Sequence, residues 1–265
     1  MSITSLDQLI AAPKQRVVFH KTASRTSVAT IPFSVFDIAG NPSGGTLAIG
    51  NTTTGIVPTK ILAGYPTINA FAGGAIGYIS ALQFGSSVAC RLNLFDCLFS
   101  AGAFAFNAAA TLSTQPSYAA RVPNGTNFNG TEIWIEAVTA FTGNQSIAVT
   151  YTNQDGVTGR TTGTIATGVA PIVGRMLQLT LQAGDTGVQK IESVTSTVST
   201  AGTFNVHVMR RLWSGRVRIA NDGDNHDFLK IGMPQVFADS ALRLVVTADS
   251  AATGIHELLI DIANG

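Results

Sequence analysis

The stretch IAVTYTNQDGVTG, residues 147–159, decides the fold class. Ile147, Val149 and Tyr151 alternate with small or polar residues. Successive side chains of a β-strand point to opposite faces, so this period of two predicts a strand with one buried face. The segment 153–156, Asn-Gln-Asp-Gly, contains residues that tolerate turn conformations. The stretch therefore predicts a short strand that ends in a tight turn.

The same period recurs through the second half of the chain, between turn-rich stretches such as QAGDTG and TADSAATG. No long amphipathic helix interrupts it, so the sequence predicts an all-β fold, an antiparallel β-sandwich or jelly roll. We expect this domain to span 31–265, with a possible subdivision near residue 125. The recurring alternations are Glu132/Trp134/Glu136, Leu177/Leu179/Leu181, Phe204/Val206/Val208, Leu242/Leu244/Val246 and Leu258/Ile260/Ile262.

Residues 1–30 are predicted to form an extended N-terminal arm with a short helix at 4–12. Thr4 and Asp7 have the spacing of a capping box. A helix of this length is not stable alone, so it either docks as an anchor or frays. Its apolar residues, which share one face and are predicted to contact a partner, are Leu6, Leu9 and Ile10.

Charged residues make up 12% of the chain, against about 25% in typical proteins. The formal net charge of +1 gives no global field that would attract nucleic acid or an anionic membrane. The N-terminal sequence has no basic leader or long apolar run, so we expect synthesis in the cytoplasm without export.

The segment 61–120 contains two charged residues, Arg91 and Asp96. A membrane span needs about 20 apolar residues, but Pro66, several polar residues and five glycines interrupt the uncharged stretch 61–87. The alternative is a backbone covered by protein, either by the same chain or by neighbouring subunits, because interface cores are depleted in charge. If neighbouring subunits cover the segment, its contact residues include Phe71, Tyr78 and Phe84.

The stretch RIANDGDNHDFLKIG, residues 218–232, is the strongest candidate for a metal site. Read as a calcium loop from Asp222, it has Asp227 where glycine is needed and Met233 where a bidentate glutamate is needed. A looser site, with Asp222 and Asp224 on a hard cation, is the alternative. We predict a solvated polar turn, with no metal and no cofactor.

Enzymatic activity is not expected. The chain has no nucleophile-elbow, zinc-protease, phosphate-loop or dinucleotide motif. Glu132 and Glu136 on one strand would lie about 13 Å apart, farther than the roughly 5 to 9.5 Å that paired carboxylates need in glycosidases. The four histidines fall on strand-like patterns, where a polar face position is expected. They are His20, His207, His226 and His256.

Cys90 and Cys97 fit no zinc spacing and are too few for a disulfide framework. We predict buried thiols, with a bridge between them as the alternative.

The stretch MRRLWSGRVRI, residues 209–219, is the one basic cluster. We expect an exposed hairpin tip turning at its Ser-Gly pair. Arginine and tryptophan are enriched in protein interfaces, so Arg210, Arg211 and Trp213 are predicted first to contact protein. A plain solvated tip is the second reading and nucleic-acid contact is the third.

Several phrases of the chain resemble a group of tailed-bacteriophage virion structural proteins. They are MSITSLDQLIAA at the start, TEIWIEAVTAFTG with IAVTYTNQDGVTGRTT, and LQAGDTGVQKIESV, spread from residue 1 to about 195. None of them is a catalytic signature. The resemblance implies a cofactor-free virion component, made in the host bacterial cytoplasm and present in many copies.

The resemblance does not say which part of the virion the protein belongs to, but it agrees with the residue-level reading of a β-rich assembly protein. The first hypothesis is a capsid decoration or cement protein. Such a protein stabilises the head through subunit interfaces, with the major capsid protein or other virion proteins as partners and a homo-oligomer, preferably a trimer, as its form. The alternative is a neck, tail or fibre-base component with a role in adsorption. A secreted carbohydrate-binding sandwich would need an aromatic strip, and the chain has two tryptophans.

Overall fold

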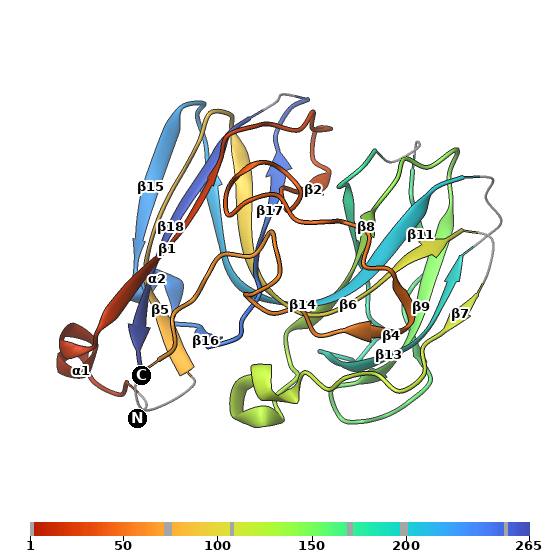
Figure 1. Ribbon diagram of the computed structural model, residues 1–265, viewed down its shortest axis with the longest axis horizontal. Helices are drawn as coiled ribbons and strands as arrows, with labels where there is room; N and C mark the ends of the chain where they lie inside the picture. Colours follow the sequence, from red (N-terminus) through yellow and green to blue (C-terminus); the bar gives the residue numbers. More distant parts are fainter. Residues whose placement is uncertain (1–2, 72–75, 107–108, 169–171, 197–200, 252–253) are drawn as a thin grey trace.

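The computed structural model describes residues 3–71, 76–106, 109–168, 172–196, 201–251 and 254–265. These residues form three antiparallel β-sheets with a short N-terminal helix, which confirms the predicted all-β class. Two lobes lie side by side and share their longest strands (Figure 1). Within the described ranges, no helix is long and apolar enough to cross a membrane.

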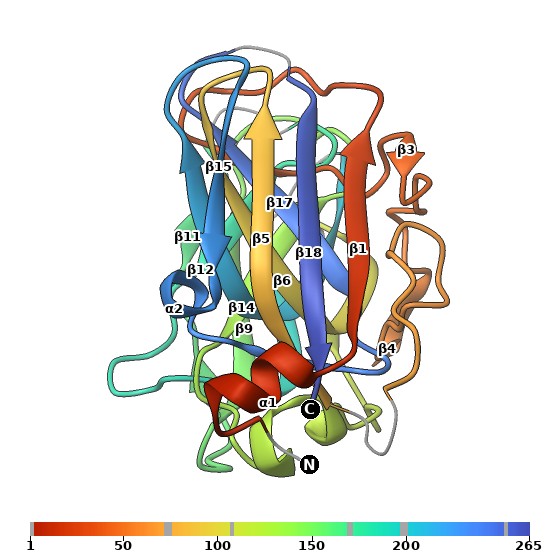
Figure 2. The ribbon, with the colours of Figure 1, turned by 90° about the vertical axis from the view of Figure 1, so that its left-hand side faces the viewer.

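The first sheet forms the outer wall of one lobe and joins the two ends of the chain (Figure 2). Its central pair is β1 with β18, in antiparallel register from Lys14–Ala263 to His20–Glu257. Strand β16 (Gln235–Phe237) extends it by pairing with β5. In spatial order the sheet comprises β15 (Asp222–Asp227), β5 (Ile76–Ser86), β18 (His256–Asn264), β1 (Lys14–Lys21) and β3 (Gly40–Asn41).

The central sheet contains the two longest strands, β6 (Cys90–Ala105) and β14 (Thr203–Val217), which pair along almost their whole length. Strand β4 (Asn51–Ile56) also pairs with β6. In spatial order the sheet comprises β12 (Met176–Leu179), β8 (Thr131–Ala137), β14, β6, β17 (Leu242–Ala248) and β2 (Pro32–Ser34).

The third sheet closes the other lobe. Its strand β9 (Ser146–Asn153) contains the first half of the stretch 147–159, and Ile147, Val149 and Tyr151 are buried as predicted. The sheet comprises β10 (Arg160–Thr161), β9, β13 (Val188–Ser196) and β7 (Ala110–Thr111), with β11 (Ile165–Ala166) paired to β9. The short helices of the chain are α1 (Leu6–Ala11), η1 (Ala119–Arg121), η2 (Pro123–Gly125) and α2 (Phe228–Ile231).

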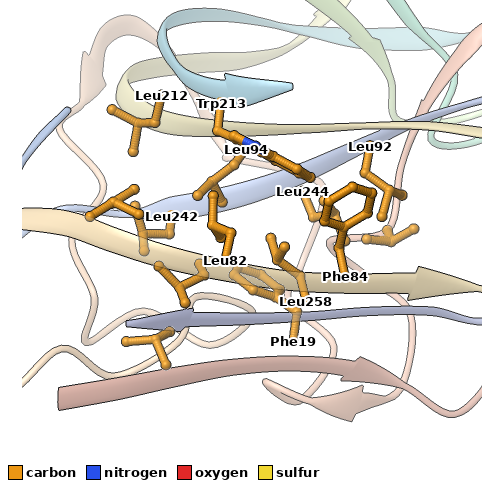
Figure 3. Packing of buried hydrophobic residues seen from close by; sticks show 14 of the residues in the cluster. Phe19, Leu82, Phe84, Leu92, Leu94, Leu212, Trp213, Leu242, Leu244 and Leu258 are labelled. Atoms are coloured by element: carbon orange, nitrogen blue, oxygen red, sulfur yellow. The ribbon is translucent and has the colours of Figure 1, made fainter. Parts of the chain in front are cut away.

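Each lobe has its own hydrophobic core, and β6 and β14 contribute to both. Leu92, Leu94 and Leu212 pack with the first sheet in a core that also contains Phe84 and Trp213 (Figure 3). The other halves of the same two strands contribute to the second core, with the third sheet. A third, smaller cluster, which includes Phe36, Tyr65 and Met209, contains further side chains of the central sheet.

This arrangement explains the low charge of 61–120. Strand β6 is buried along nearly all of its length because it lies inside the central sheet, with Arg91 exposed near its start. The covering protein at β6 is therefore the same chain. Among the residues of 61–120 that the structure describes, the exposed large apolar side chains are Ile61 and Leu62, before β5.

Three local predictions were wrong in detail. Helix α1 is capped by Ser5 and Gln8 rather than by Thr4 and Asp7. The predicted turn at 222–227 is an exposed edge strand, β15. The predicted hairpin tip at 209–219 lies mostly within β14, which continues through the Ser-Gly pair to Val217 because both residues pair with β6.

Candidate functional site

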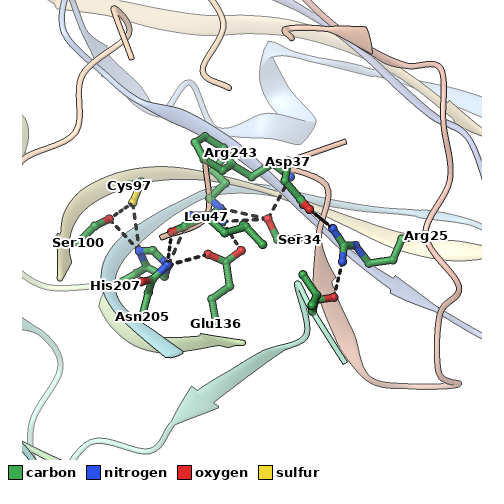
Figure 4. A network of polar contacts seen from close by, with 12 residues as sticks. Arg25, Ser34, Asp37, Leu47, Cys97, Ser100, Glu136, Asn205, His207 and Arg243 are labelled. Atoms are coloured by element: carbon green, nitrogen blue, oxygen red, sulfur yellow. Dashed lines mark hydrogen bonds and ion pairs between the residues drawn. The ribbon is translucent and has the colours of Figure 1, made fainter. Parts of the chain in front are cut away.

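A buried polar network lies against the central sheet beneath the segment 34–65. Glu136 on β8, His207 on β14 and Arg243 on β17 come from three different strands of this sheet. All three side chains are almost completely inaccessible to solvent. Figure 4 shows them pointing toward one another, with Ser34, the last residue of β2, also bonded to Arg243.

The contacts form a continuous chain of charged and polar groups. The Arg243 guanidinium donates to Glu136 Oε1 and, over 2.9 Å, to Ser34 Oγ. The other carboxylate oxygen of Glu136 lies 3.1 Å from His207 Nε2. On the far side of the imidazole, Ser100 Oγ lies 2.7 Å from Nδ1. The Cys97 thiol lies 3.3 Å from that hydroxyl.

The covering segment is fastened to this network at further points. Asn205 Nδ2 donates to the backbone carbonyl of Leu47 over 2.6 Å. The Phe36 ring lies over the Arg243 guanidinium at 4.5 Å, in a cation–π contact. The network therefore joins the 34–65 segment to the central sheet.

The charges of the network shift the pKa values of its members. Burial would raise the pKa of Glu136, but the Arg243 charge and the His207 hydrogen bond outweigh it and lower the pKa to about 2. Burial and the Arg243 charge oppose protonation of His207, yet its contacts with Cys97 and Glu136 raise its pKa. Burial raises the pKa of Cys97, whereas His207 and Arg243 lower it, to about 7 overall.

Hydroxyl, imidazole and carboxylate stand here in the order that serine hydrolases use. Ser100, Cys97 and His207 are nevertheless fully buried, and Glu136 is held by Arg243. A pocket of about 280 Å³ lies nearby, but Phe36 and Tyr65 line it, and the same two side chains contact Arg243 and Cys97. The geometry thus supports a structural role, in which the network holds the segment 34–65 against the central sheet.

A second buried cluster centres on Asp96 of β6. Its carboxylate accepts hydrogen bonds from Arg121 of η1, from Ser240 Oγ over 2.7 Å and from the backbone amide of Ala241. Arg210 of β14 approaches the same carboxylate to 3.8 Å. Arg121 also donates to the carbonyls of Pro58 and Cys97. One carboxylate thus connects β6, β14 and the η1 segment.

The predicted interface residues fall into two groups. Arg211 is exposed and pairs with Glu132 over 3.1 Å. Leu6 and Ile10 are also exposed, and Tyr78 is half-buried. Those that pack inside the chain are Leu9, Phe71, Phe84, Arg210 and Trp213.

Trp213 is held by its own lobe. Its ring packs edge-on against Phe84, with ring centroids 4.7 Å apart. Its indole Nε1 donates to His226 Nδ1 over 2.9 Å. His226 is therefore a structural partner of the tryptophan rather than a free polar residue.

The candidate cation residues Asp222 and Asp224 lie exposed on β15. Each carboxylate accepts a hydrogen bond from the next backbone amide, over 2.8 Å. Asp224 also pairs with Lys230 at 3.2 Å. Within the described ranges, no group of three or more His, Cys, Asp or Glu side chains could hold a metal ion. Cys90 and Cys97 are free, buried thiols, as predicted.

His256, on β18, is a buried histidine that sequence reasoning had placed on a polar face. Its Nδ1 lies 2.9 Å from Ser86 Oγ. Its Nε2 is buried and has no hydrogen-bond partner among the described residues. Burial opposes the charged imidazolium and lowers the pKa of His256 to about 4.

We expect His256 to make the protein sensitive to acid. The unfolded chain protonates this imidazole near pH 6.5, whereas the folded chain keeps it neutral until about pH 4. Its contribution to stability is therefore complete above pH 6.5 and is lost as the pH falls toward 4, by up to about 3 kcal/mol. Urea denaturation at a series of pH values measures this loss.

The matched variant is His256→Gln, which cannot be protonated and should flatten the profile in this window. Both proteins keep His207, whose raised pKa acts in the opposite direction, so their difference isolates His256. Equal slopes for the two proteins would assign the acid sensitivity to another group.

No family model matches this chain, and no curated protein matches it. Among solved structures, the VP2 subviral particle of infectious bursal disease virus is weakly similar, at 10% identity and a TM-score of 0.17, over 96% of this chain and 80% of that one. A mutant VP2 of the same virus, in T=1 particles, gives 9% identity and a TM-score of 0.19, over 99% and 80%. These scores are too low to carry an argument about function.

Proposed function

We propose that this protein is a non-enzymatic structural component of a bacteriophage virion, and that it decorates the capsid. One observation carries the proposal. The nucleophilic and charged side chains that the fold gathers are buried and bonded to one another, whereas large apolar side chains stand on the surface. A protein of this kind offers contact surface rather than a reaction centre. The resemblance of several phrases to tailed-bacteriophage virion proteins supports a virion component, without indicating which part of the virion.

The surface around Ile61 is the proposed footing on the shell. Ile61 is 84% exposed and Leu62 is 41% exposed. Leu62 also lines the 280 Å³ pocket, together with Ile49 and Pro58. An exposed apolar knob beside an apolar hollow suits a capsid protein with a complementary apolar surface, because burial of apolar area drives such contacts.

The copy number of the protein relative to the major capsid protein in purified particles tests the assignment. We expect a ratio near one or a simple fraction such as one third, measured by quantitative mass spectrometry. A ratio near one per hundred would instead indicate a neck, tail or fibre-base component. Absence of the protein from particles would contradict any virion role.

A second experiment tests whether the surface around Ile61 contacts the capsid, with phage heads from which this protein has been removed. Adding back the purified protein should restore resistance to heat, and Ile61→Asp should bind the heads at least about tenfold more weakly. Ile219→Asp is the matched control, because Ile219 is also a largely exposed isoleucine but lies between β14 and β15. Equal binding by both variants would exclude Ile61 from the contact.

A further inference from the structure

Helices α1 and α2 lie toward the same end of the first sheet (Figure 2). Residues of both helices line an apolar hollow. The hollow has a volume of about 230 Å³, and its lining includes Leu6 and Leu9 of α1 and Phe228 of α2. Leu9 is the buried side chain of α1. The walls of the hollow are mainly apolar.

Exposed apolar side chains of both helices lie beside this hollow. Leu229 of α2 is 77% exposed, and Ile10 and Leu6 of α1 are 66% and 54% exposed. One small surface thus carries both a cavity that accepts an apolar side chain and side chains that could fill such a cavity. A surface with both features is complementary to itself.

The charges of the two helices have the same self-complementary arrangement. Asp7 is the one charged residue of α1, and Lys230 is the one charged residue of α2. Lys230 pairs with Asp224 of its own chain at 3.2 Å, but its side chain is 54% exposed and can contact a second carboxylate. Each lies next to an exposed leucine, Leu6 or Leu229. In a two-fold contact every residue pair occurs twice, with the roles of the two copies exchanged. A two-fold axis that places α1 of one copy on α2 of the other would pair Asp7 with Lys230 twice.

We propose that this α1–α2 surface binds a second copy of the same chain, with Leu229 of each copy seated in the hollow of the other. The partner is another copy because the surface supplies both the knob and the hole, and both signs of charge. This contact is two-fold, in contrast to the trimer expected from the sequence. It concerns the purified chain and does not rest on the proposed capsid role.

Sedimentation equilibrium of the purified full-length chain tests the proposal. We expect a dimer, and we expect Leu229→Asp to raise its dissociation constant at least about tenfold. Because Leu229 is largely exposed in the single chain, the variant should keep the wild-type circular dichroism. Its urea midpoint should equal that of the wild type at concentrations where both proteins are monomeric. Ile219→Asp should leave the dimer intact. Ile219 is 69% exposed and precedes β15, whereas α2 follows the other end of that strand.

A charge-reversal experiment tests the reciprocal geometry. Asp7→Lys and Lys230→Asp should each weaken self-association, since each places like charges opposite one another in both copies. An equimolar mixture of the two variants should regain the dimer, because both pairs across the mixed contact are then attractive. A helix loosened by substitution would not be restored by mixing.

Three results would overturn the proposal. They are a monomer at every concentration tested, a trimer, and a dimer that Leu229→Asp leaves unchanged. None of them bears on the copy number in virions or on the Ile61 footing, so the two proposals can fail separately.

Discussion

Replacing Arg243 with methionine should lower the free energy of unfolding by about 3–5 kcal/mol. The substitution fills a similar volume but leaves Glu136 without its counterion in a site closed to water, beside His207. Removing one partner of a buried pair costs this much because the remaining group has neither solvent nor a partner of opposite charge. Ser34 of β2 also loses its hydrogen bond to the guanidinium, and Phe36 loses its cation–π contact.

Urea denaturation followed by tryptophan fluorescence measures the effect of Arg243→Met. The double variant Arg243→Met/Glu136→Leu should lose less stability than the single variant, because it removes both charges together. Arg16→Met is the matched control, since Arg16 pairs with Asp261 on the exposed face of the first sheet, and its urea midpoint should stay unchanged. A wild-type midpoint for Arg243→Met would contradict the assigned role of the ion pair.

The alternation of apolar and polar residues predicted the strands well, but it predicted wrongly which faces of the strands are exposed to solvent. In β14, Phe204, Val206 and Val208 were assigned to the core, and they are buried. Asn205 and His207, between them, were assigned to a polar face and are equally buried. A period of two separates the faces of one strand, whereas the layer that covers each face comes from elsewhere in the chain.

The covering layer was hard to predict for a physical reason. The segment 34–65 is mostly irregular, with the short strands β3 and β4, so it carries little periodic signal. A usable sign was nevertheless present in the sequence. Trp134 and Met209 sit on the faces that Glu136 and His207 occupy, and such apolar residues on a nominally polar face indicate that the face is covered.

Pairing between the chain ends was also beyond local reasoning. Strand β1 was predicted as part of an extended arm, yet it pairs with β18 near the other terminus. The sequence of neither strand identifies the strand with which it pairs. Strand register depends on the hydrophobic pattern and on turns, and no short turn joins β1 to β18. By contrast, α1 was predicted correctly as an element, because capping signals are local, although the capping pair is Ser5 and Gln8 and not the predicted Thr4 and Asp7.

The buried carboxylate of Asp96 should be as sensitive as the Glu136 pair, with a more localised consequence. In Asp96→Asn, Arg121 and Arg210 would keep their positions but lose their negative partner. Among the described residues, neither guanidinium forms a salt bridge with any other carboxylate. We expect the free energy of unfolding to fall by about 3–5 kcal/mol, as measured by urea denaturation.

Two comparisons isolate the charge effect. Ser240→Ala removes one hydrogen bond to the same carboxylate and one that its hydroxyl accepts from the Phe237 amide, and should cost about 2 kcal/mol. Asp261→Asn breaks the exposed pair with Arg16 and should leave the urea midpoint unchanged. An Asp96→Asn variant no less stable than Ser240→Ala would mean that the two arginines do not depend on the carboxylate charge.

The position of Arg121 also predicts where Asp96→Asn first loses structure. Arg121 fixes the η1 turn to β6 through Asp96 and Cys97, and it reaches the carbonyl of Pro58. Without the carboxylate these segments lose their strongest attachment, whereas the strands of both cores keep theirs. Limited proteolysis in urea should therefore cut near 119–125 before global unfolding. Cleavage that appears only with global unfolding would show that the hydrophobic contacts of Tyr118 and Val122 suffice to hold this turn.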